Sequence, residues 1–126
     1  MHATLLFDNT FYSDYEAEID AGQVGPAQRF LQSATKAKII VSIVTIAEYY
    51  ERYGREAAAL LAVNHPAIGL HFADALKCGE IQTRLAAKRL GENDAWLATQ
   101  AIRSGATLVT RDKRFKDVRG LSVATY

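Results

Sequence analysis

Three short apolar segments, each stopped by polar residues, most strongly limit the folds open to this chain. They are Ala3–Phe7, Ile39–Val44 and Ala106–Val109, and Leu121–Ala124 is a last, shorter one. Continuous apolar runs of this length are typical of strands covered on both faces. Segments with helical periodicity separate them, which favours parallel pairing with helices on both sides. We therefore expect a three-layer α/β/α fold with a central parallel sheet of four to five strands.

The segments between these runs predict helices, with one exception. Apolar spacing favours helices over 26–36 and 45–63, with Gly54 as a weak point in the second. Asn93 is expected to cap a helix over 94–104, and residues 67–92 predict one or two helices interrupted near Gly79. The exception is a polar stretch that predicts a loop because of its acidic residues, Asp14, Glu16, Glu18 and Asp20.

Length and composition indicate one globular domain. The chain has 126 residues, and we expect a single domain over 1–126 because two halves would each be too small for a good core. Its single cysteine, Cys78, allows no internal disulfide and no cysteine-built zinc site. The longest apolar run is far too short to cross a bilayer, and the N-terminus has neither a basic segment nor, because of Asp8, an uninterrupted signal-peptide core. We therefore expect a cytoplasmic protein that does not bind membranes.

Positive charge gathers toward the C-terminus, although the formal net charge is only +1. Residues 1–83 carry six basic and ten acidic side chains, a net of −4, whereas residues 84–126 carry nine basic and four acidic ones, a net of +5. Five basic residues fall within nine positions: Arg111, Lys113, Arg114, Lys116 and Arg119. Such a run is either a solvated surface or a contact for a polyanion.

Four carboxylates occupy positions that a parallel sheet can bring to one edge. Asp8 directly follows the first strand, Glu48 lies near the start of the helix after the second, and Asp112 follows the third. Strand-to-helix junctions of a parallel sheet share the edge at which such sheets bind ligands. Asp94 joins this group only if its helix begins beside that edge.

Each carboxylate also has a purely structural explanation. Asp8 and Asp112 fit turns, Glu48 completes a capping box with Thr45, and Asp94 suits the positive end of a helix. Together, however, carboxylates in one cleft repel one another unless a cation neutralises them. An all-oxygen set suits a hard cation, which predicts a site for Mg²⁺ or Mn²⁺.

The segment from Leu5 to Tyr12 resembles the opening motif of haloacid-dehalogenase-type phosphatases. Those enzymes need a nucleophilic Asp two positions before their acid–base Asp. Leu6 stands at that position here, so the chain has no nucleophile for that reaction. The chain is also short for that fold with its cap, and we reject this interpretation.

A second resemblance covers nearly the whole chain. Residues 42–48 read S-I-V-T-I-A-E and resemble the S-x-V-T-x-x-E segment of PIN-domain nucleases, and residues 93–99 resemble their N-D-x-x-I-A-A segment. Residues 105–112, G-A-T-L-V-T-R-D, resemble their G-A-x-L-V-T-x-D strand, and residues 115–121 match the F-x-x-V-x-G-L tail. A single PIN domain of this length resembles a VapC-type toxin ribonuclease.

The resemblance implies roles for particular residues. The positions that match the family's four acidic residues, and would be catalytic and hold Mg²⁺ or Mn²⁺, are Asp8, Glu48, Asp94 and Asp112. Thr110 would give polar support, together with Asn9 or Thr10; which of these two faces the metal stays open because their order departs from the usual motif. The expected contacts to RNA phosphates are Arg111, Lys113, Arg114 and Lys116.

The resemblance further implies a metal-dependent endoribonuclease, the toxin of a toxin–antitoxin pair, that leaves 5′-phosphate and 3′-hydroxyl ends. It implies a homodimer and a cognate antitoxin. Six aromatic residues in the first half of the chain are either all part of the core or in part line a groove for an antitoxin segment, which is our prediction: Phe11, Tyr12, Tyr15, Tyr49, Tyr50 and Tyr53. Two alternatives stay open: a free-standing PIN nuclease without an antitoxin, and a non-catalytic PIN interaction module. A small reading frame directly upstream would favour the toxin.

Overall fold

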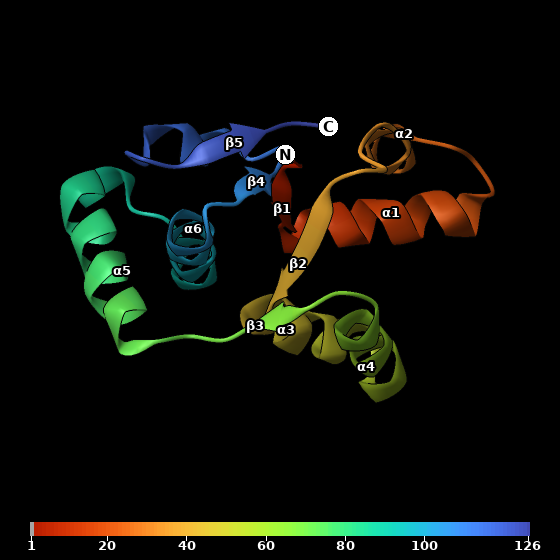
Figure 1. Ribbon diagram of the computed structural model, residues 1–126, viewed down its shortest axis with the longest axis horizontal. Coiled ribbons are helices and arrows are strands. Elements are labelled where there is room, and N and C mark those ends of the chain that lie inside the picture. Colours follow the sequence, from red (N-terminus) through yellow and green to blue (C-terminus); the bar gives the residue numbers. More distant parts are fainter. Residues whose placement is uncertain (1) are drawn as a thin grey trace.

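A five-stranded parallel sheet lies between two layers of helices in the computed structural model, which describes residues 2–126 (Figure 1). The strands are β1 (Thr4–Phe7), β2 (Lys38–Ser42), β3 (Ala67–Ile68), β4 (Thr107–Val109) and β5 (Ser122–Ala124). Their order is β3-β2-β1-β4-β5, and every neighbouring pair is parallel. This confirms the expected α/β fold.

The helices fall on the two sides of the sheet as Figure 1 shows, with α5 and α6 on one side and α1 and α2 on the other. They are α1 (Asn9–Ala21), α2 (Pro26–Ser33), α3 (Ile43–Tyr53), α4 (Arg55–Asn64), α5 (Phe72–Leu85) and α6 (Glu92–Ser104). Two short 3-10 helices, η1 (Ala86–Lys88) and η2 (Lys113–Asp117), follow α5 and β4. None of these helices has the length and apolar character that a bilayer crossing requires, as far as residues 2–126 are concerned.

Successive residues of the central strands supply two separate cores. Leu6 and Leu108 pack with residues of α5 and α6, whereas Leu5 and Val109 pack with residues of α1 and α2. Neighbouring side chains of a strand point to opposite faces, so a strand covered on both faces is apolar throughout. This double burial explains why the strands could be found in the sequence.

The acidic segment near the N-terminus is helix α1, and the predicted loop is wrong. Asp8 caps this helix by accepting a hydrogen bond from the backbone N–H of Phe11 at 2.8 Å. Phe11 is buried, and Tyr15, one helical turn later, packs against the same core. Aromatic residues form the buried face of α1, and the acidic residues between them hid its helical period in the sequence.

The single helix predicted over 45–63 is two helices that meet at Gly54. Gly54 has φ 93°, a conformation that residues with a side chain rarely adopt, so α3 ends and α4 begins there. Helix α3 also begins early, capped by Ser42, whose Oγ accepts a hydrogen bond from the N–H of Val44. Thr45 therefore lies inside the helix, and the capping box with Glu48 does not exist.

The segment over 67–92 contributes β3 and α5, and α5 runs through Gly79 without the expected interruption. The buried amide of Gln100 secures the end of β3, because its Nε2 donates to the carbonyls of Ile68 and Gly69 at 3.2 and 3.1 Å. Helix α6 is capped by Gly91, so Asn93 lies in its first turn instead of capping it.

Candidate active site

Asp8 is a fixed and buried carboxylate at the carboxyl end of β1, with 5% of its surface exposed. Its Oδ1 accepts the N–H of Phe11 at 2.8 Å, and its Oδ2 accepts the hydroxyl of Thr110 at 2.5 Å. Thr110 follows β4, which lies beside β1. Burial raises the pKa of Asp8, the two hydrogen bonds oppose this shift, and the negative charges of Asp94 and Asp112 add to it.

Glu48 on α3 and Asp94 in the first turn of α6 are half-buried carboxylates of the same group. Burial raises the pKa of Glu48, the Asn93 side chain opposes the shift, and the charges of Asp94 and Asp8 add to it. Burial likewise raises the pKa of Asp94, where Arg114 opposes the shift and Asp112 reinforces it. Helix α6 begins near Asp112, because one nitrogen of Arg114 lies 3.5 Å from Asp94 and 2.6 Å from Asp112.

A basic side chain of the same chain bridges two of the carboxylates. The Nε and Nη2 atoms of Arg114 donate to the Asp112 carboxylate, with the shortest contact, from Nη2 to Oδ2, at 2.6 Å. The same Nη2 lies 3.5 Å from Oδ2 of Asp94. The hydrogen bond from Arg114 lowers the pKa of Asp112. The sequence predicted a phosphate contact for Arg114 and contained no signal for this bridge.

The structure separates the two candidates for polar support next to Asp8. Oδ1 of Asn9 is buried and has no hydrogen-bond partner among residues 2–126, whereas Thr10 is exposed. A buried hydrogen-bond acceptor without a partner lowers the stability of the fold by about 1–3 kcal/mol. A ligand that contacts this oxygen would recover part of that free energy. This geometry favours Asn9 over Thr10. Thr110 supports the site in another way: its hydroxyl oxygen also accepts the N–H of Asp112 at 3.0 Å.

The donor chemistry of the site fits a cation, although its geometry is not that of a preassembled metal centre. Within the described residues, no three acidic, histidine or cysteine side chains stand close enough to hold a metal ion. Arg114 holds Asp112, and the hydrogen bonds described above hold Asp8. Carboxylates that raise one another's pKa are nevertheless stabilised by positive charge, and the Arg114 guanidinium already stands between two of them.

The other predicted phosphate contacts lie on both sides of Asp112. Arg111 faces α1, where its Nη1 lies 3.4 Å from Oδ2 of Asp14, and it also lies over the ring of Tyr126. Lys113 and Lys116 are exposed on η2 and line a separate cavity with Arg114. Arg111 therefore points away from the basic residues that follow it.

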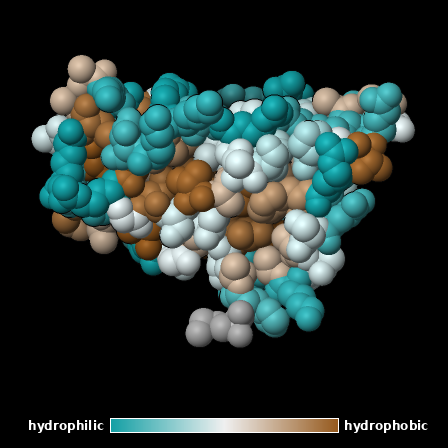
Figure 2. All heavy atoms as spheres, turned by 90° about the horizontal axis from the view of Figure 1, so that it is seen from above, coloured by the Kyte–Doolittle hydropathy of each residue, from teal (hydrophilic) through white to brown (hydrophobic). Residues whose placement is uncertain are grey.

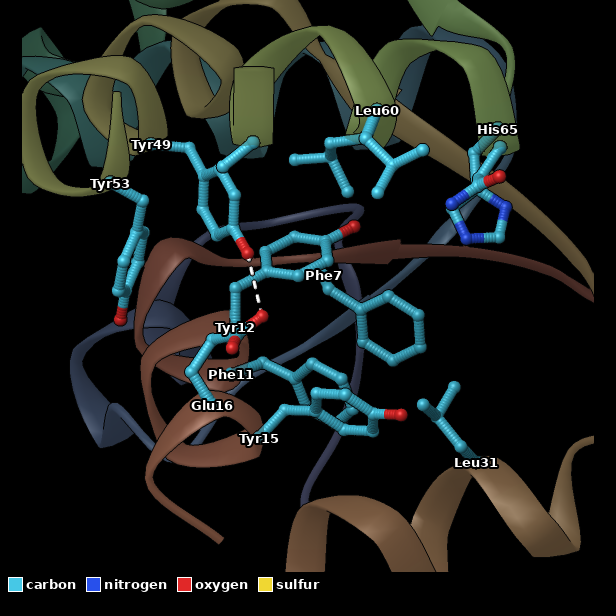
Figure 3. Close-up of a pocket in the computed structure, with 13 residues that line it drawn as sticks. Phe7, Phe11, Tyr12, Tyr15, Glu16, Leu31, Tyr49, Tyr53, Leu60 and His65 are labelled. Carbon is cyan, nitrogen blue, oxygen red and sulfur yellow. Dashed lines mark hydrogen bonds between the residues drawn. The ribbon is translucent and has the colours of Figure 1, made fainter. Parts of the chain in front are cut away.

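An aromatic groove of about 490 Å³ lies between α1, α3 and α4, with Leu31 of α2 at its side (Figure 3). Five of the six aromatic residues expected in a groove line it: Phe11, Tyr12, Tyr15, Tyr49 and Tyr53. Tyr50 is exposed and does not line it. The hydroxyl of Tyr49 donates to Glu16 at 2.7 Å, the bond drawn in Figure 3, and Leu60 of α4 adds to the apolar wall.

Comparison with known proteins gives one family and several similar folds. The sequence matches the PIN domain family over residues 19–121, a range that contains Glu48, Asp94 and Asp112 but begins after Asp8. No curated protein matches it.

Three solved structures illustrate the likeness in fold. A chain of the VapBC2 complex from Rickettsia felis, bound to a DNA fragment of its promoter, has a TM-score of 0.77 at 20% identity, over 97% of this chain and 98% of that one. VapBC-1 from nontypeable Haemophilus influenzae gives 0.70 at 19%, over 97% of each chain. VapC20 from Mycobacterium tuberculosis, a toxin that cleaves the sarcin–ricin loop, gives 0.65 at 19%, over 89% of this chain and 92% of that one.

Proposed function

The chain belongs to the PIN domain family, and from that premise we propose that it is a metal-dependent endoribonuclease, the toxin of a toxin–antitoxin pair. The observation that carries this proposal is the placement of the carboxylates at one edge of the sheet, where Thr110 contacts both Asp8 and the backbone N–H of Asp112, and Arg114 spans Asp112 and Asp94. Likeness in fold to VapBC complexes supports the toxin, and likeness to a toxin that cleaves the sarcin–ricin loop supports RNA as the substrate.

The four carboxylates would hold Mg²⁺ or Mn²⁺, with Oδ1 of Asn9 as a further oxygen close to Asp8. When bound, such an ion lowers the pKa of a coordinated water and offsets negative charge on the phosphodiester. Thr110 and the N–H of Phe11 hold both oxygens of Asp8, so this carboxylate is fixed before any ligand arrives. Arg114 partly neutralises Asp112 and Asp94, and its guanidinium has the charge and shape to contact a phosphate oxygen instead.

Incubation with total RNA tests this proposal directly. We expect cleavage in Mg²⁺ or Mn²⁺ and none in a chelator, because the carboxylates alone repel the phosphodiester. The fragments should carry 5′-phosphates, so a kinase should label them only after phosphatase treatment. RNA that stays intact with both metals, or that is cut equally well in the chelator, would refute the proposal.

Arg114 competes with a metal for Asp112 and Asp94, which gives a prediction for metal binding. Replacing it, Arg114→Gln, should tighten Mn²⁺ binding by about two- to fivefold, the range typical of an exposed ion pair. Titration calorimetry measures this, with Arg119→Gln as the control, since Arg119 belongs to the same basic run and is exposed. Weaker Mn²⁺ binding by Arg114→Gln would show that Arg114 helps to assemble the site and does not compete for it.

We also propose that an antitoxin segment occupies the aromatic groove, since apolar walls of this size suit an apolar stretch of another chain. The groove adjoins the carboxylates, because Asp8 caps the helix that carries Phe11 and Tyr12. A bound segment would therefore end close to the catalytic edge. A chain with no antitoxin encoded upstream would instead be the free-standing nuclease.

Apolar side chains on the surface support the proposal of a homodimer. Large exposed ones include Phe72 and Val63, each with 80% of its surface exposed, and Leu76. Figure 2 shows apolar areas among hydrophilic ones on one face of the molecule. Phe72 and Leu76 lie one helical turn apart on α5, and contiguous exposed apolar side chains are typical of protein interfaces. Sedimentation equilibrium measures the oligomeric state and should give the mass of a dimer. The cytoplasmic location stays a prediction.

A further inference from the structure

A basic cavity of about 420 Å³ lies beside the carboxylates, between η1 and η2. Its lining consists of Ala87, Lys88, Arg89, Lys113, Arg114, Lys116 and Asp117. Five of these seven residues are basic and one is acidic. Lys88 and Arg89 come from the segment before α6, far from the basic run around Asp112, so the sequence did not connect them with it.

Arg114 belongs to this basic cavity and to the carboxylate group at once. It lines the cavity, while its Nη2 contacts Asp112 at 2.6 Å and lies 3.5 Å from Asp94. The cavity has two walls, one around Lys88 and Arg89 and the other formed by η2, and each wall adjoins a segment that carries one of the carboxylates. Arg89 lies two residues before Gly91, the cap of α6, and η2 begins directly after Asp112, its cap. A ligand in the cavity is therefore next to the proposed cleavage site.

Both walls of the basic cavity are anchored in the core. Leu90 and Phe115 are buried in the same apolar cluster, one beside Arg89 and the other between Arg114 and Lys116. The side chain of Gln82 also accepts the N–H of Leu90 at 2.9 Å and donates to its carbonyl at 2.7 Å. The backbone that carries these cations is thus held in place, which lowers the cost of presenting them to a ligand.

The cations of the basic cavity are free of internal ion pairs, with the exception of Arg114. Among residues 2–126, no acidic group lies within ion-pair distance of Lys88, Arg89, Lys113 or Lys116. On α5, by contrast, Lys77 and Arg84 both pair with Glu80, at 3.6 and 3.5 Å. Four unpaired cations around one cavity favour an anionic ligand.

We propose that the basic cavity binds the phosphate backbone of single-stranded RNA on its way to the carboxylates, with Lys88 and Arg89 as its outer contacts. This inference rests on the proposed function and adds the path of the substrate. Cations beside the carboxylates offset the repulsion that an acidic site exerts on a polyanion. RNA is favoured over an acidic protein segment because the cavity leads, through Arg114, to the carboxylates that would cleave a phosphodiester.

The test compares two double variants that lose the same charge. Lys88→Gln with Arg89→Gln removes two cavity cations, and Lys77→Gln with Arg84→Gln removes two cations from α5. Binding of a fluorescein-labelled single-stranded RNA is measured by anisotropy in EDTA, so that no cleavage occurs, at several KCl concentrations. The cavity variant should bind about tenfold more weakly at low salt, and its plot of log affinity against log salt should be shallower by about 1.4, as expected for two lost contacts to a single strand.

The control variant should keep the wild-type slope, and so should the charge-conserving exchange of Lys88→Arg with Arg89→Lys. A cavity variant with the wild-type slope would overturn the inference. A polyglutamate peptide that binds wild type but not the cavity variant, with the RNA slope unchanged, would overturn it in favour of a protein segment. Cleavage of RNA by wild type in Mn²⁺, measured in parallel, reports separately on the proposed function.

Discussion

Asp8→Asn should abolish RNA cleavage while leaving the fold intact. Changes in the outer contacts of metal ligands typically cost about 10–100-fold in activity, so neutralising a proposed ligand should cost on the order of a hundredfold or more. Asparagine keeps an oxygen for the N–H of Phe11 and fits the same buried space, so the cap of α1 survives. The rate of cleavage of a labelled RNA in Mn²⁺ measures the loss.

The same substitution should also change stability in the absence of metal. Burial raises the pKa of Asp8, so the folded state binds this proton more tightly than the unfolded state does. The free energy of unfolding of wild type should therefore fall as the pH rises from the ordinary pKa of an aspartate to the raised pKa of Asp8 in the folded state. Asp8→Asn lacks this proton, so its free energy of unfolding should fall less over the same range. Urea denaturation in a chelator, from about pH 4 to about pH 8, compares the two proteins.

Asp20→Asn is the matched control, because it removes the same charge from an exposed position near the end of α1. It should keep wild-type cleavage. Asp94→Asn should behave like Asp8→Asn in cleavage, since both belong to the same carboxylate group. If both variants cleave RNA at the wild-type rate, these residues do not form the active site.

The sheet and the edge that carries the carboxylates could be predicted because their signals are local. A strand buried on both faces must be apolar from end to end, and the polar residue that stops it marks the edge. Asp8 and Asp112 were located in this way, after strands that pair in register at Phe7 and Val109, whereas Thr110 was indicated by the family resemblance. Because both faces of these strands are buried, few residue types are tolerated there, and the sequence pattern therefore agrees with the structure.

Other parts of the fold depend on contacts between distant segments, which the pattern does not contain. The buried face of α1 consists of aromatic residues that alternate with acids, so it was taken for a loop until its partners on the sheet were known. Strand β3 has only two residues and is secured by Gln100 from α6. The break at Gly54 depends on a positive φ that composition alone could only suggest.

The candidate site shows the same division between local and distant contacts. Asp8, Glu48 and Asp112 follow from their places at strand ends and a helix start, whereas Asp94 was assigned to the group through the family resemblance. The bridge from Arg114 to Asp94 and the approach of Lys88 and Arg89 to η2 arise only when Leu90 and Phe115 enter one core. Basic residues that lie around a site can come from any exposed position in the chain. Their positions therefore follow no pattern that the sequence alone reveals.

A substitution in the aromatic groove should strongly weaken binding of the partner protein. Leu60→Glu should disrupt the complex with the protein encoded directly upstream, because it places a charge on the apolar wall of the groove. Residues central to an interface typically contribute 2 kcal/mol or more, so affinity should fall about thirtyfold or more. Leu60 is 60% exposed in the free chain, so the substitution costs the fold little.

Val63→Glu provides the comparison that isolates the groove. Val63 lies on the same helix, is 80% exposed and does not line the groove, so its variant changes the charge of α4 equally. Titration calorimetry on the purified chains should give wild-type affinity for Val63→Glu and a weak or absent signal for Leu60→Glu. Equal affinities for the two variants would place the partner on another surface, and the exposed apolar side chains of α5, Phe72 and Leu76, would become the first place to look. Phe7, the residue before Asp8, lines the groove, so an occupant would lie near the carboxylates, and loss of binding should restore RNA cleavage in the mixed proteins.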